Sequence, residues 1–218
     1  MHTISVIGGT GELGSGLAQR WAKAGIPVII GSRDLNKAEI ASAELNAKVK
    51  NNITQGMTNF NAASKSDIVV LTVKFEHQAS TLDELNSALH GKILVDTTVP
   101  LMPPKVARVQ LPSEGSAAVI SQNSVDKSTQ VVSAFQNVSA AALKNDVVSE
   151  CDVLVTGDNP EAREIVVKLA EEAGFTAWHA GPLENSAAAE ALTSLLIFMN
   201  KRYKNNHAGL KITGISKP

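Results

Sequence analysis

The chain contains almost no cysteine, and it has no long apolar run. Cys151 is the one cysteine among 218 residues, which excludes an internal disulfide and any site built from several cysteines. A lone cysteine suits a reducing cytoplasm, where we expect the protein, and its simplest interpretation is a small core residue. Nowhere do 18 apolar residues follow one another, so we expect no membrane-spanning segment.

An excess of charge of one sign is also missing. The 20 basic and 21 acidic residues give a formal net charge of -1, so we expect no nucleic-acid partner. The first residues lead straight into an apolar run, which does not resemble a signal peptide. With 44% hydrophobic and 19% charged residues, the composition is that of an ordinary soluble globular chain.

Several signatures of catalysis are absent. The chain has no His-x-x-His, no His-Glu-x-x-His and no cysteine cluster, so we expect no metal site. Carbonyl reductases commonly carry a Tyr-x-x-x-Lys pair for proton delivery. The sole tyrosine, Tyr203, is followed by Asn206 and His207 at those offsets, which disfavours a carbonyl reductase.

Short apolar runs alternate with segments of helical periodicity. The strands are expected at "TISVIG", "PVIIGS", "DIVVLTV" and "KILVDT", and the helices between them at 13–25, 35–49 and 77–89. Strands that are apolar on both faces, each followed by a helix, indicate an α/β fold with a doubly wound parallel sheet of Rossmann type.

The second half of the chain is expected to form a small α/β or helical domain. Residues 101–116 suit a surface connection, "QVVSAF" and "CDVLVTG" are further strands, and a helix is predicted from Pro160 to Ala173, capped by Asp158 or Asn159. A long last helix follows, with an apolar stripe of Leu192, Leu195, Leu196 and Met199 that makes a homodimer the expected state. We place the two domains at 1–145 and 146–218.

The stretch "GGTGELG" contains glycines at the spacing G-x-G-x-x-G, between the first strand and the first helix. In such a turn Gly9 permits the tight bend, Gly11 lets the backbone approach a pyrophosphate, and Gly14 lets the helix lie against the strand. The alternative is a purely structural turn. The strand-turn-helix context favours a dinucleotide site.

The end of the second strand indicates which dinucleotide binds. Sites selective for NAD usually place a carboxylate there, whereas this strand ends in Ser32 and Arg33, with Lys37 one helical turn further on. A hydroxyl and a guanidinium suit a 2'-phosphate, so NADP is predicted. The alternative is that Arg33 and Lys37 are solvated surface charges, one of them paired with Asp34.

Four motifs together resemble a known family. The residues "GGTGELG", "GSRD..KA", "VVLTV.FEH" and "AGPLENS...E.LTSLLI" look like the NADP-dependent reductases of coenzyme F420, an 8-hydroxy-5-deazaflavin hydride carrier. The similarity covers almost the whole chain. It implies a Rossmann domain carrying NADP, a small C-terminal domain, and a deazaflavin bound in the cleft between them.

The resemblance also implies site residues. They comprise Thr10, Gly11, Glu12 and Leu13 at the pyrophosphate, beside Gly9 and Gly14 of the glycine turn; Ser32, Arg33 and Lys37 at the 2'-phosphate; Thr72, Val73 and His77 near the nicotinamide half; and Val99 to Leu101 along the cleft floor. The chain departs from the pattern of similar proteins twice. It has Lys74 where proline is common and Gln136 where histidine is common, and both bear on the deazaflavin pocket.

The implied reaction is hydride transfer between deazaflavin and NADP. Because both partners carry their own reactivity, the protein has to orient them and exclude water, and we expect no catalytic triad. His77 is therefore interpreted as a positioning residue. Two alternatives stay open: an NADPH-dependent flavin or ferric reductase, and a non-catalytic NADP-sensing module.

Overall fold

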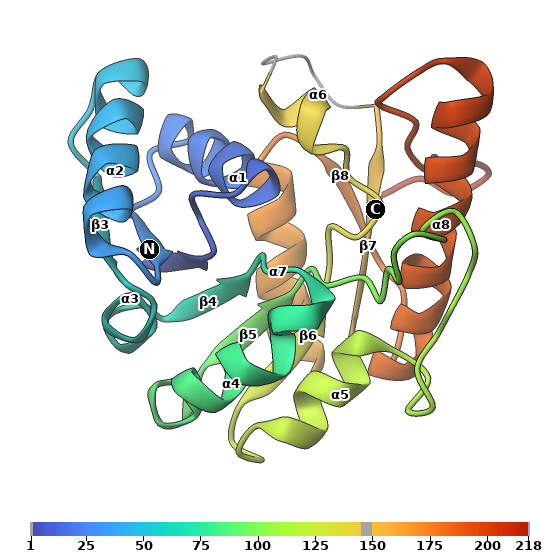
Figure 1. Cartoon of the computed structure of the whole chain (residues 1–218), viewed down its shortest axis with the longest axis horizontal. Helices are drawn as coiled ribbons and strands as arrows, with labels where there is room; N and C mark the ends of the chain where they lie inside the picture. The colour runs from blue at the N-terminus through green and yellow to red at the C-terminus, as the bar shows by residue number, and fades with distance from the viewer. Residues whose placement is uncertain (1, 145–149, 218) are drawn as a thin grey trace.

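One eight-stranded sheet forms the centre of the computed structural model, which describes residues 2–144 and 150–217 (Figure 1). Its strands are β1 (Ile4–Ile7), β2 (Val28–Ser32), β3 (Thr54–Thr58), β4 (Ile68–Leu71), β5 (Ile93–Asp96), β6 (Gln130–Ser133), β7 (Asp152–Gly157) and β8 (Thr176–His179). They lie in the order β3-β2-β1-β4-β5-β6-β7-β8. The strands from β3 to β6 pair in parallel, which confirms the predicted fold class. The last two differ: β7 runs antiparallel to β6, and β8 runs parallel to β7.

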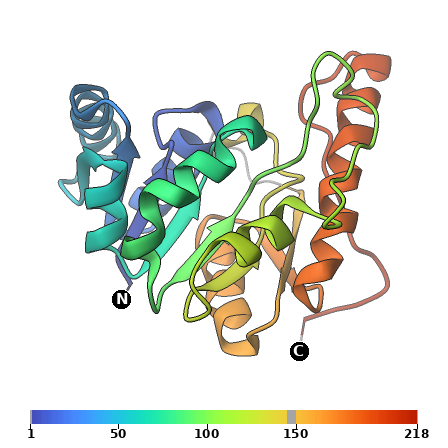
Figure 2. The same ribbon diagram turned by 60° about the horizontal axis from the view of Figure 1, so that its bottom comes forward.

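Helices cover both faces of this sheet. They are α1 (Glu12–Lys23), α2 (Leu35–Val49), α3 (Asn59–Lys65), α4 (Phe75–Leu89), α5 (Ala117–Ser124), α6 (Ala140–Lys144), α7 (Pro160–Glu172), the short 3-10 helix η1 (Leu183–Asn185) and α8 (Ser186–Tyr203). Because side chains alternate along β1, Val6 joins the core that includes Trp21 of α1, whereas Ile7 joins the core that includes Leu82 and Leu85 of α4. Figure 2 shows α4 and α5 together on the second face.

Most predicted elements are present, and the helix caps follow side-chain chemistry. α2 has the predicted bounds, and α7 begins at Pro160. Of the two predicted caps of α7, Asn159 is the actual one, since its side chain accepts a hydrogen bond from Ala162 N at 2.9 Å. Asp158 instead accepts from Leu183 N at 3.0 Å and so holds η1.

Besides α3, α6 and η1, three further elements lie where no strand or helix was predicted. β3 is an edge strand of sequence TQGMT and pairs only with β2 among the described strands. α5 begins directly after the 101–116 connection, where Ser116 accepts from Val119 N at 3.1 Å and caps the helix. β8 lies between the predicted helix from Pro160 to Ala173 and the long last helix, where no strand was predicted.

An aromatic cluster joins the first and last parts of the chain. The ring of Phe135 packs edge-on against Trp21 at 5.9 Å and against Phe175 at 6.1 Å between centroids. Trp21 Nε1 also donates to the carbonyl of Leu169 in α7 at 2.9 Å. The sheet and this core therefore continue from β6 to β7. The predicted domain boundary between residues 145 and 146 lies outside the described residues.

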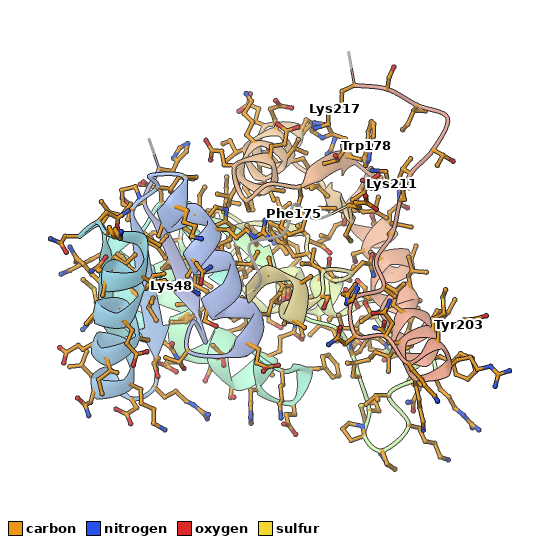
Figure 3. All side chains as sticks on the ribbon, turned by 90° about the horizontal axis from the view of Figure 1, so that it is seen from above. Lys48, Phe175, Trp178, Tyr203, Lys211 and Lys217 are labelled. Carbon is orange, nitrogen blue, oxygen red and sulfur yellow. The ribbon has the colours of Figure 1, made fainter. Side chains whose placement is uncertain are left out.

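The apolar stripe predicted for α8 is wrong. Leu196 is buried, but Leu195 and Met199 are 48% and 45% exposed. The buried residues of α8 are Ser186, Ala189, Glu190, Ser194 and Leu196, of which only Leu196 is a large apolar residue. At the end of the helix Tyr203 projects outward and is 73% exposed (Figure 3).

The C-terminal segment returns to the start of β7. Asp152, which is buried, accepts hydrogen bonds from Trp178 Nε1 at 2.9 Å and from Ile212 N at 2.8 Å. Lys211 lies near the same carboxylate, with an N–O distance of 3.7 Å, and is seen beside Trp178 in Figure 3. None of the described helices is long and apolar enough to span a bilayer.

Candidate functional site

The carboxyl ends of neighbouring parallel strands carry the predicted site residues. Gly9 follows β1, Ser32 ends β2, Thr72 follows β4, Val99 follows β5 and Gln136 follows β6. In the order β2-β1-β4-β5-β6 these strands are direct neighbours, so the residues lie along one edge of the sheet. In open α/β sheets ligands bind at this edge, where the strand order reverses, which here is between β1 and β4.

The turn between β1 and α1 also needs Gly8, which precedes the three glycines of the G-x-G-x-x-G spacing. Gly8 has a φ of +76°, in the left-handed region that suits glycine. Gly9 needs its missing side chain for another reason, because a Cβ there would stand 2.7 Å from Val6 O. The nitrogen of Gly9 donates to Val6 O at 3.2 Å and to Gly31 O at 3.1 Å, which joins the turn to β2.

Gly11 and Gly14 face different surroundings. A Cβ on Gly11 would meet only the carbonyl oxygen of Gly8, at 3.2 Å, so the space beyond residue 11 is open. A Cβ on Gly14 would stand 2.5 Å from Thr72 Oγ1 and 2.9 Å from Gly8 O. The open side of Gly11 suits a ligand, and the closed side of Gly14 suits helix packing.

The first turn of α1 presents backbone donors at this open place. The N-cap of α1 is Gly11, which has no side chain that could accept a hydrogen bond from the first N–H groups of the helix. The first N–H groups of an α-helix have no partner inside the helix, and together with the helix dipole they favour an anion. Thr10 and Glu12 are exposed beside them, and Leu13 is half-buried. A pyrophosphate fits this arrangement.

Two cations follow β2 with their side chains in solvent. Ser32 is 8% exposed, and its hydroxyl accepts from Asp34 N at 3.2 Å. The carboxylate of Asp34 accepts from the backbone N–H of Lys37 at 3.3 Å and so caps α2. Arg33 and Lys37 are both exposed. The exposure of Arg33 and Lys37 suits both a phosphate site and the alternative of solvated surface charges.

The segment after β4 is held by Thr72. Its hydroxyl donates to Ile7 O at 2.8 Å, while Val73 is half-buried beside it. Lys74 is the N-cap of α4 and its side chain is 82% exposed. The ring of His77 is 46% exposed and lies 3.7 Å from a carboxylate oxygen of Glu76. About half of this ring is in contact with solvent, so packing alone does not fix its orientation.

Gln136 is fixed on the inner side of the site. Its Nε2 donates to Asp96 O and to Ser133 Oγ, each at 2.8 Å, and the residue is 6% exposed. Its Oε1 is buried and has no hydrogen-bond partner among the described residues. The preceding residue, Phe135, has a φ of +72°, a conformation that is uncommon for a bulky side chain. Val99 is half-buried, and its carbonyl accepts from Leu101 N at 2.7 Å.

Two buried carboxylates near this edge were not predicted. Asp96 ends β5 and is fully buried, and Glu190 of α8 is 1% exposed. Burial raises the pKa of Glu190 to about 8; hydrogen bonds from Ala117 and Ala118 oppose this rise, and the charge of Asp96 adds to it. Glu190 belongs to one of the motifs named above, but periodicity alone places it among surface residues, so its burial had no signal in the sequence.

No group of three or more His, Cys, Asp or Glu side chains that could hold a metal ion occurs in residues 2–144 and 150–217. Cys151 is half-buried, and burial raises the pKa of its thiol. A thiol of this kind is a weak nucleophile at neutral pH.

Comparison with solved structures agrees with the fold. A putative F420 dependent NADP-reductase from Arthrobacter superposes with a TM-score of 0.81 and 24% identity, covering 98% of this chain and 100% of that chain. A rat metalloreductase, STEAP3, is 29% identical in sequence over 87% of this chain but matches only 36% of its own length. Because this match covers only 36% of STEAP3, it does not favour the ferric reductase alternative.

Sequence comparison identifies the family. A family model described as NADP oxidoreductase coenzyme F420-dependent matches residues 3–100. The F420-dependent NADP reductase of Methanocaldococcus jannaschii is 41% identical over 97% of this chain and 98% of its own length. The enzyme of the same name from Methanothermobacter thermautotrophicus is 42% identical, over 97% and 95% respectively. The chain therefore belongs to the family of F420-dependent NADP reductases.

Proposed function

We propose that the protein transfers a hydride directly between coenzyme F420 and NADP. The observation that carries this proposal is the identity of about two residues in five with reductases of that name over nearly the full chain. The open glycine cradle at the N-terminus of α1 supports it, since this is a site that a dinucleotide pyrophosphate fits.

NADP would be held along β1 and β2. Backbone donors at the start of α1 would bind the pyrophosphate, and the space beside Gly11 admits it. Ser32, Arg33 and Lys37 would bind the 2'-phosphate. The planar guanidinium of Arg33 can donate two parallel hydrogen bonds to phosphate oxygens, which gives it the largest share of the preference for NADP over NAD.

The reaction places few chemical demands on the side chains. The cosubstrates supply both the hydride and its acceptor, so the protein contributes orientation and exclusion of water. Thr72 and Val73 would form the wall beside the nicotinamide, because the hydrogen bond from Thr72 Oγ1 to Ile7 O fixes that backbone. His77, half-exposed at the start of α4, would help to position a cosubstrate without exchanging a proton.

Lys74 and Gln136 would make the deazaflavin pocket of this chain differ from that of similar proteins, which commonly have proline and histidine at these positions. Gln136 is neutral at every pH and its donors are already engaged, so it would shape the floor together with Val99 and cannot act as an acid. Lys74 could approach an anionic group of the deazaflavin from the mouth of the site, since its ion pair with Glu76 is 3.8 Å long and exposed.

A homodimer in the cytoplasm is part of the proposal. Exposed apolar side chains gather on α8, namely Leu195, Phe198 and Met199. Others lie on the 101–116 connection, namely Met102, Val109 and Leu111. The two segments adjoin, since Ser194 Oγ donates to Arg108 O at 3.2 Å. A second copy would cover these side chains. Light scattering during gel filtration tests this state: Phe198→Glu should convert a dimer into a monomer.

The direct test of function is an absorbance assay with the purified protein, NADPH and coenzyme F420. We expect loss of the deazaflavin absorbance band as NADPH is consumed, and recovery of the band when reduced F420 is mixed with NADP. Flavin and ferric complexes in the same assay test the alternative acceptors. Turnover with those acceptors and none with F420 would contradict the proposal, and binding of NADPH without turnover of any acceptor would favour a sensing module.

A further inference from the structure

The side chain of Glu190 caps a helix that lies 72 residues earlier in the chain. One of its carboxyl oxygens accepts from Ala117 N at 2.7 Å, and the other accepts from Ala118 N at 3.1 Å. These are the first two N–H groups of α5, which have no partner inside the helix, and a carboxyl group at a helix N-terminus is favourable. α8 is thereby fastened to α5.

Asp96 fastens α5 from the side of the sheet. Its Oδ2 accepts from Ser121 Oγ at 2.5 Å and from Gln78 Nε2 at 2.8 Å, so it joins β5, α5 and α4. Gln78 Nε2 also lies 3.0 Å from Ala117 O, next to the place where Glu190 binds. α5 is thus held between two buried carboxyl groups that come from distant parts of the chain.

This buried network touches the inner half of the site. The other carboxyl oxygen of Asp96 accepts from Thr98 N at 2.7 Å, immediately before Val99. Gln136 donates to the backbone oxygen of Asp96. From α8, Thr193 Oγ1 donates to Gln136 O at 2.9 Å, one helical turn after Glu190. The position of α8 therefore bears on both Gln136 and the segment that contains Val99.

The phosphate-binding part of the nucleotide site does not share these contacts among the described residues. The glycine turn is held by β1, β2 and Thr72, and the N-terminus of α2 is held by Asp34. The network does border the nicotinamide part, because Gln78 follows His77 in α4 and Thr97 Oγ1 donates to Leu71 O at 2.9 Å. A disturbance at Glu190 would therefore reach the inner half of the site and leave the residues expected to bind the phosphates of NADP in place.

Resting on the proposed function, we propose that Glu190 is a positioning residue for the deazaflavin. By binding both of its carboxyl oxygens to the N-terminus of α5, it fixes α8 and the 97–116 segment against the carboxyl end of the sheet. That arrangement sets the floor of the pocket at Val99 and Gln136. Glu190 itself contacts neither cosubstrate.

Ionisation of Glu190 makes this role depend on pH. The proton is lost around pH 8, where burial and the charge of Asp96 place the pKa of Glu190. Asp96 is the charged group that acts on it from β5, α5 presents the backbone N–H groups of Ala117 and Ala118, and the neutral hydroxyl of Ser186 hydrogen-bonds to it from α8. Above pH 8 the bonds from Ala117 and Ala118 become charge-assisted, but the cost of burying a second negative charge beside Asp96 outweighs this gain, so the contact between α8 and α5 is weakened. The KM for F420 should then rise, while the Kd for NADPH should not.

The test compares wild type with Glu190→Gln. Glutamine has almost the same shape but turns one acceptor into a donor that faces a backbone N–H, so one of the two hydrogen bonds is lost. We expect the KM for F420 to rise about tenfold or more at pH 7 and the Kd for NADPH to change by less than about twofold. The ratio of the two KM values should depend on pH around 8. Titration of the cosubstrates cancels in this ratio, because both proteins meet the same solution.

Ser194→Ala is the matched control. It removes a hydrogen bond of 3.2 Å between α8 and the 101–116 connection, one turn after Glu190, but leaves the network intact. We expect its KM for F420 to stay within about threefold of wild type. If Glu190→Gln does not fold, the proposal can be tested with wild type alone. Its Kd for F420, corrected for the titration of free F420, should rise above about pH 8, while its Kd for NADPH stays constant.

Three results would overturn the role of Glu190. The first is equal kinetic constants for wild type and Glu190→Gln from about pH 6 to about pH 9, and the second is parallel losses for both cosubstrates. The third, if the variant does not fold, is a Kd of wild type for F420 that does not depend on pH. An inactive wild type would contradict the proposed function instead. The two failures are thus distinct.

Discussion

The hydroxyl of Thr72 occupies the space that a side chain on residue 14 would need. A Cβ at Gly14 would lie 2.5 Å from Thr72 Oγ1 and 2.9 Å from the Gly8 carbonyl oxygen. Thr72 is held in place, since its hydroxyl donates to Ile7 O at 2.8 Å. The close approach of α1 to the end of β4 therefore depends on the absence of one carbon atom.

Gly14→Ala should destabilise the protein by about 1 to 3 kcal/mol, because the overlap outweighs the better helix propensity of alanine. Urea unfolding measures this change. The matched control is Gly11→Ala, whose Cβ meets only Gly8 O at 3.2 Å. This control should keep its stability within about 0.5 kcal/mol and should instead lose affinity for NADP. Equal stability of Gly14→Ala and wild type would contradict the packing role.

Arg33→Ala should weaken NADP binding by about 1.5 to 3 kcal/mol, or roughly 10- to 150-fold, because a charge-assisted bidentate contact is lost. The affinity for NAD, which has no 2'-phosphate, should hardly change. Titration calorimetry with both nucleotides measures the two effects. Lys127→Ala, at another exposed cation outside the site, serves as the control for net charge. Equal losses for NADP and NAD would remove Arg33 from the 2'-phosphate site.

The strands of the Rossmann half could be predicted because each is apolar on both faces. β1, β2, β4 and β5 are buried runs of β-branched and leucine residues, and their order in the chain left few topologies open. β3 escaped prediction because TQGMT is a partly exposed edge strand without an apolar run. It is held through Gly56, where a Cβ would stand 2.3 Å from the backbone of Ala38.

The inner half of the site could not be derived in the same way. Periodicity placed the leucines of α8 inside and its polar residues outside, whereas Glu190 is buried and Leu195 is exposed. A buried carboxyl group depends on partners elsewhere in the chain, here Ala117 and Ala118, which helical spacing cannot reveal. By contrast, the glycine turn and the exposed position of Arg33 after β2 could be predicted, because both depend on residues that are close in the sequence.

The free energy of unfolding should depend on pH through Glu190. Its pKa is about 8 in the folded protein, against an ordinary value of 4.5. As pH rises between these values, the unfolded chain gives up this proton while the folded protein keeps it, so stability falls by at most about 1.4 kcal/mol per pH unit. Below the lower value and above the upper value the contribution is constant.

Urea unfolding at several pH values checks this sign. The stability of wild type relative to Glu190→Gln should fall between about pH 5 and about pH 8. Glu44→Gln, at an exposed position of α2, is the control. A stability difference between wild type and Glu190→Gln that stays constant over the range would show that Glu190 has no raised pKa.

His77→Ala should lower turnover only modestly, by about tenfold, because we propose that its half-exposed ring only orients a cosubstrate. A general acid or base would contribute about 10² to 10⁴. Steady-state kinetics at saturating NADPH and F420 gives the value, and the Kd for NADPH shows whether binding is intact. A thousandfold loss of turnover with intact binding would place His77 in the chemistry.

Direct hydride transfer is the central claim, and an isotope label tests it most directly. NADPH that carries deuterium in the transferred position at carbon 4 is mixed with F420 and the protein in ordinary water, and the reduced deazaflavin is analysed by mass spectrometry. If the protein only orients the two cosubstrates, the deuterium passes to the deazaflavin without dilution by solvent hydrogen. Loss of the label to water would contradict this account, since it would mean that a group able to exchange with solvent carries the hydrogen between them.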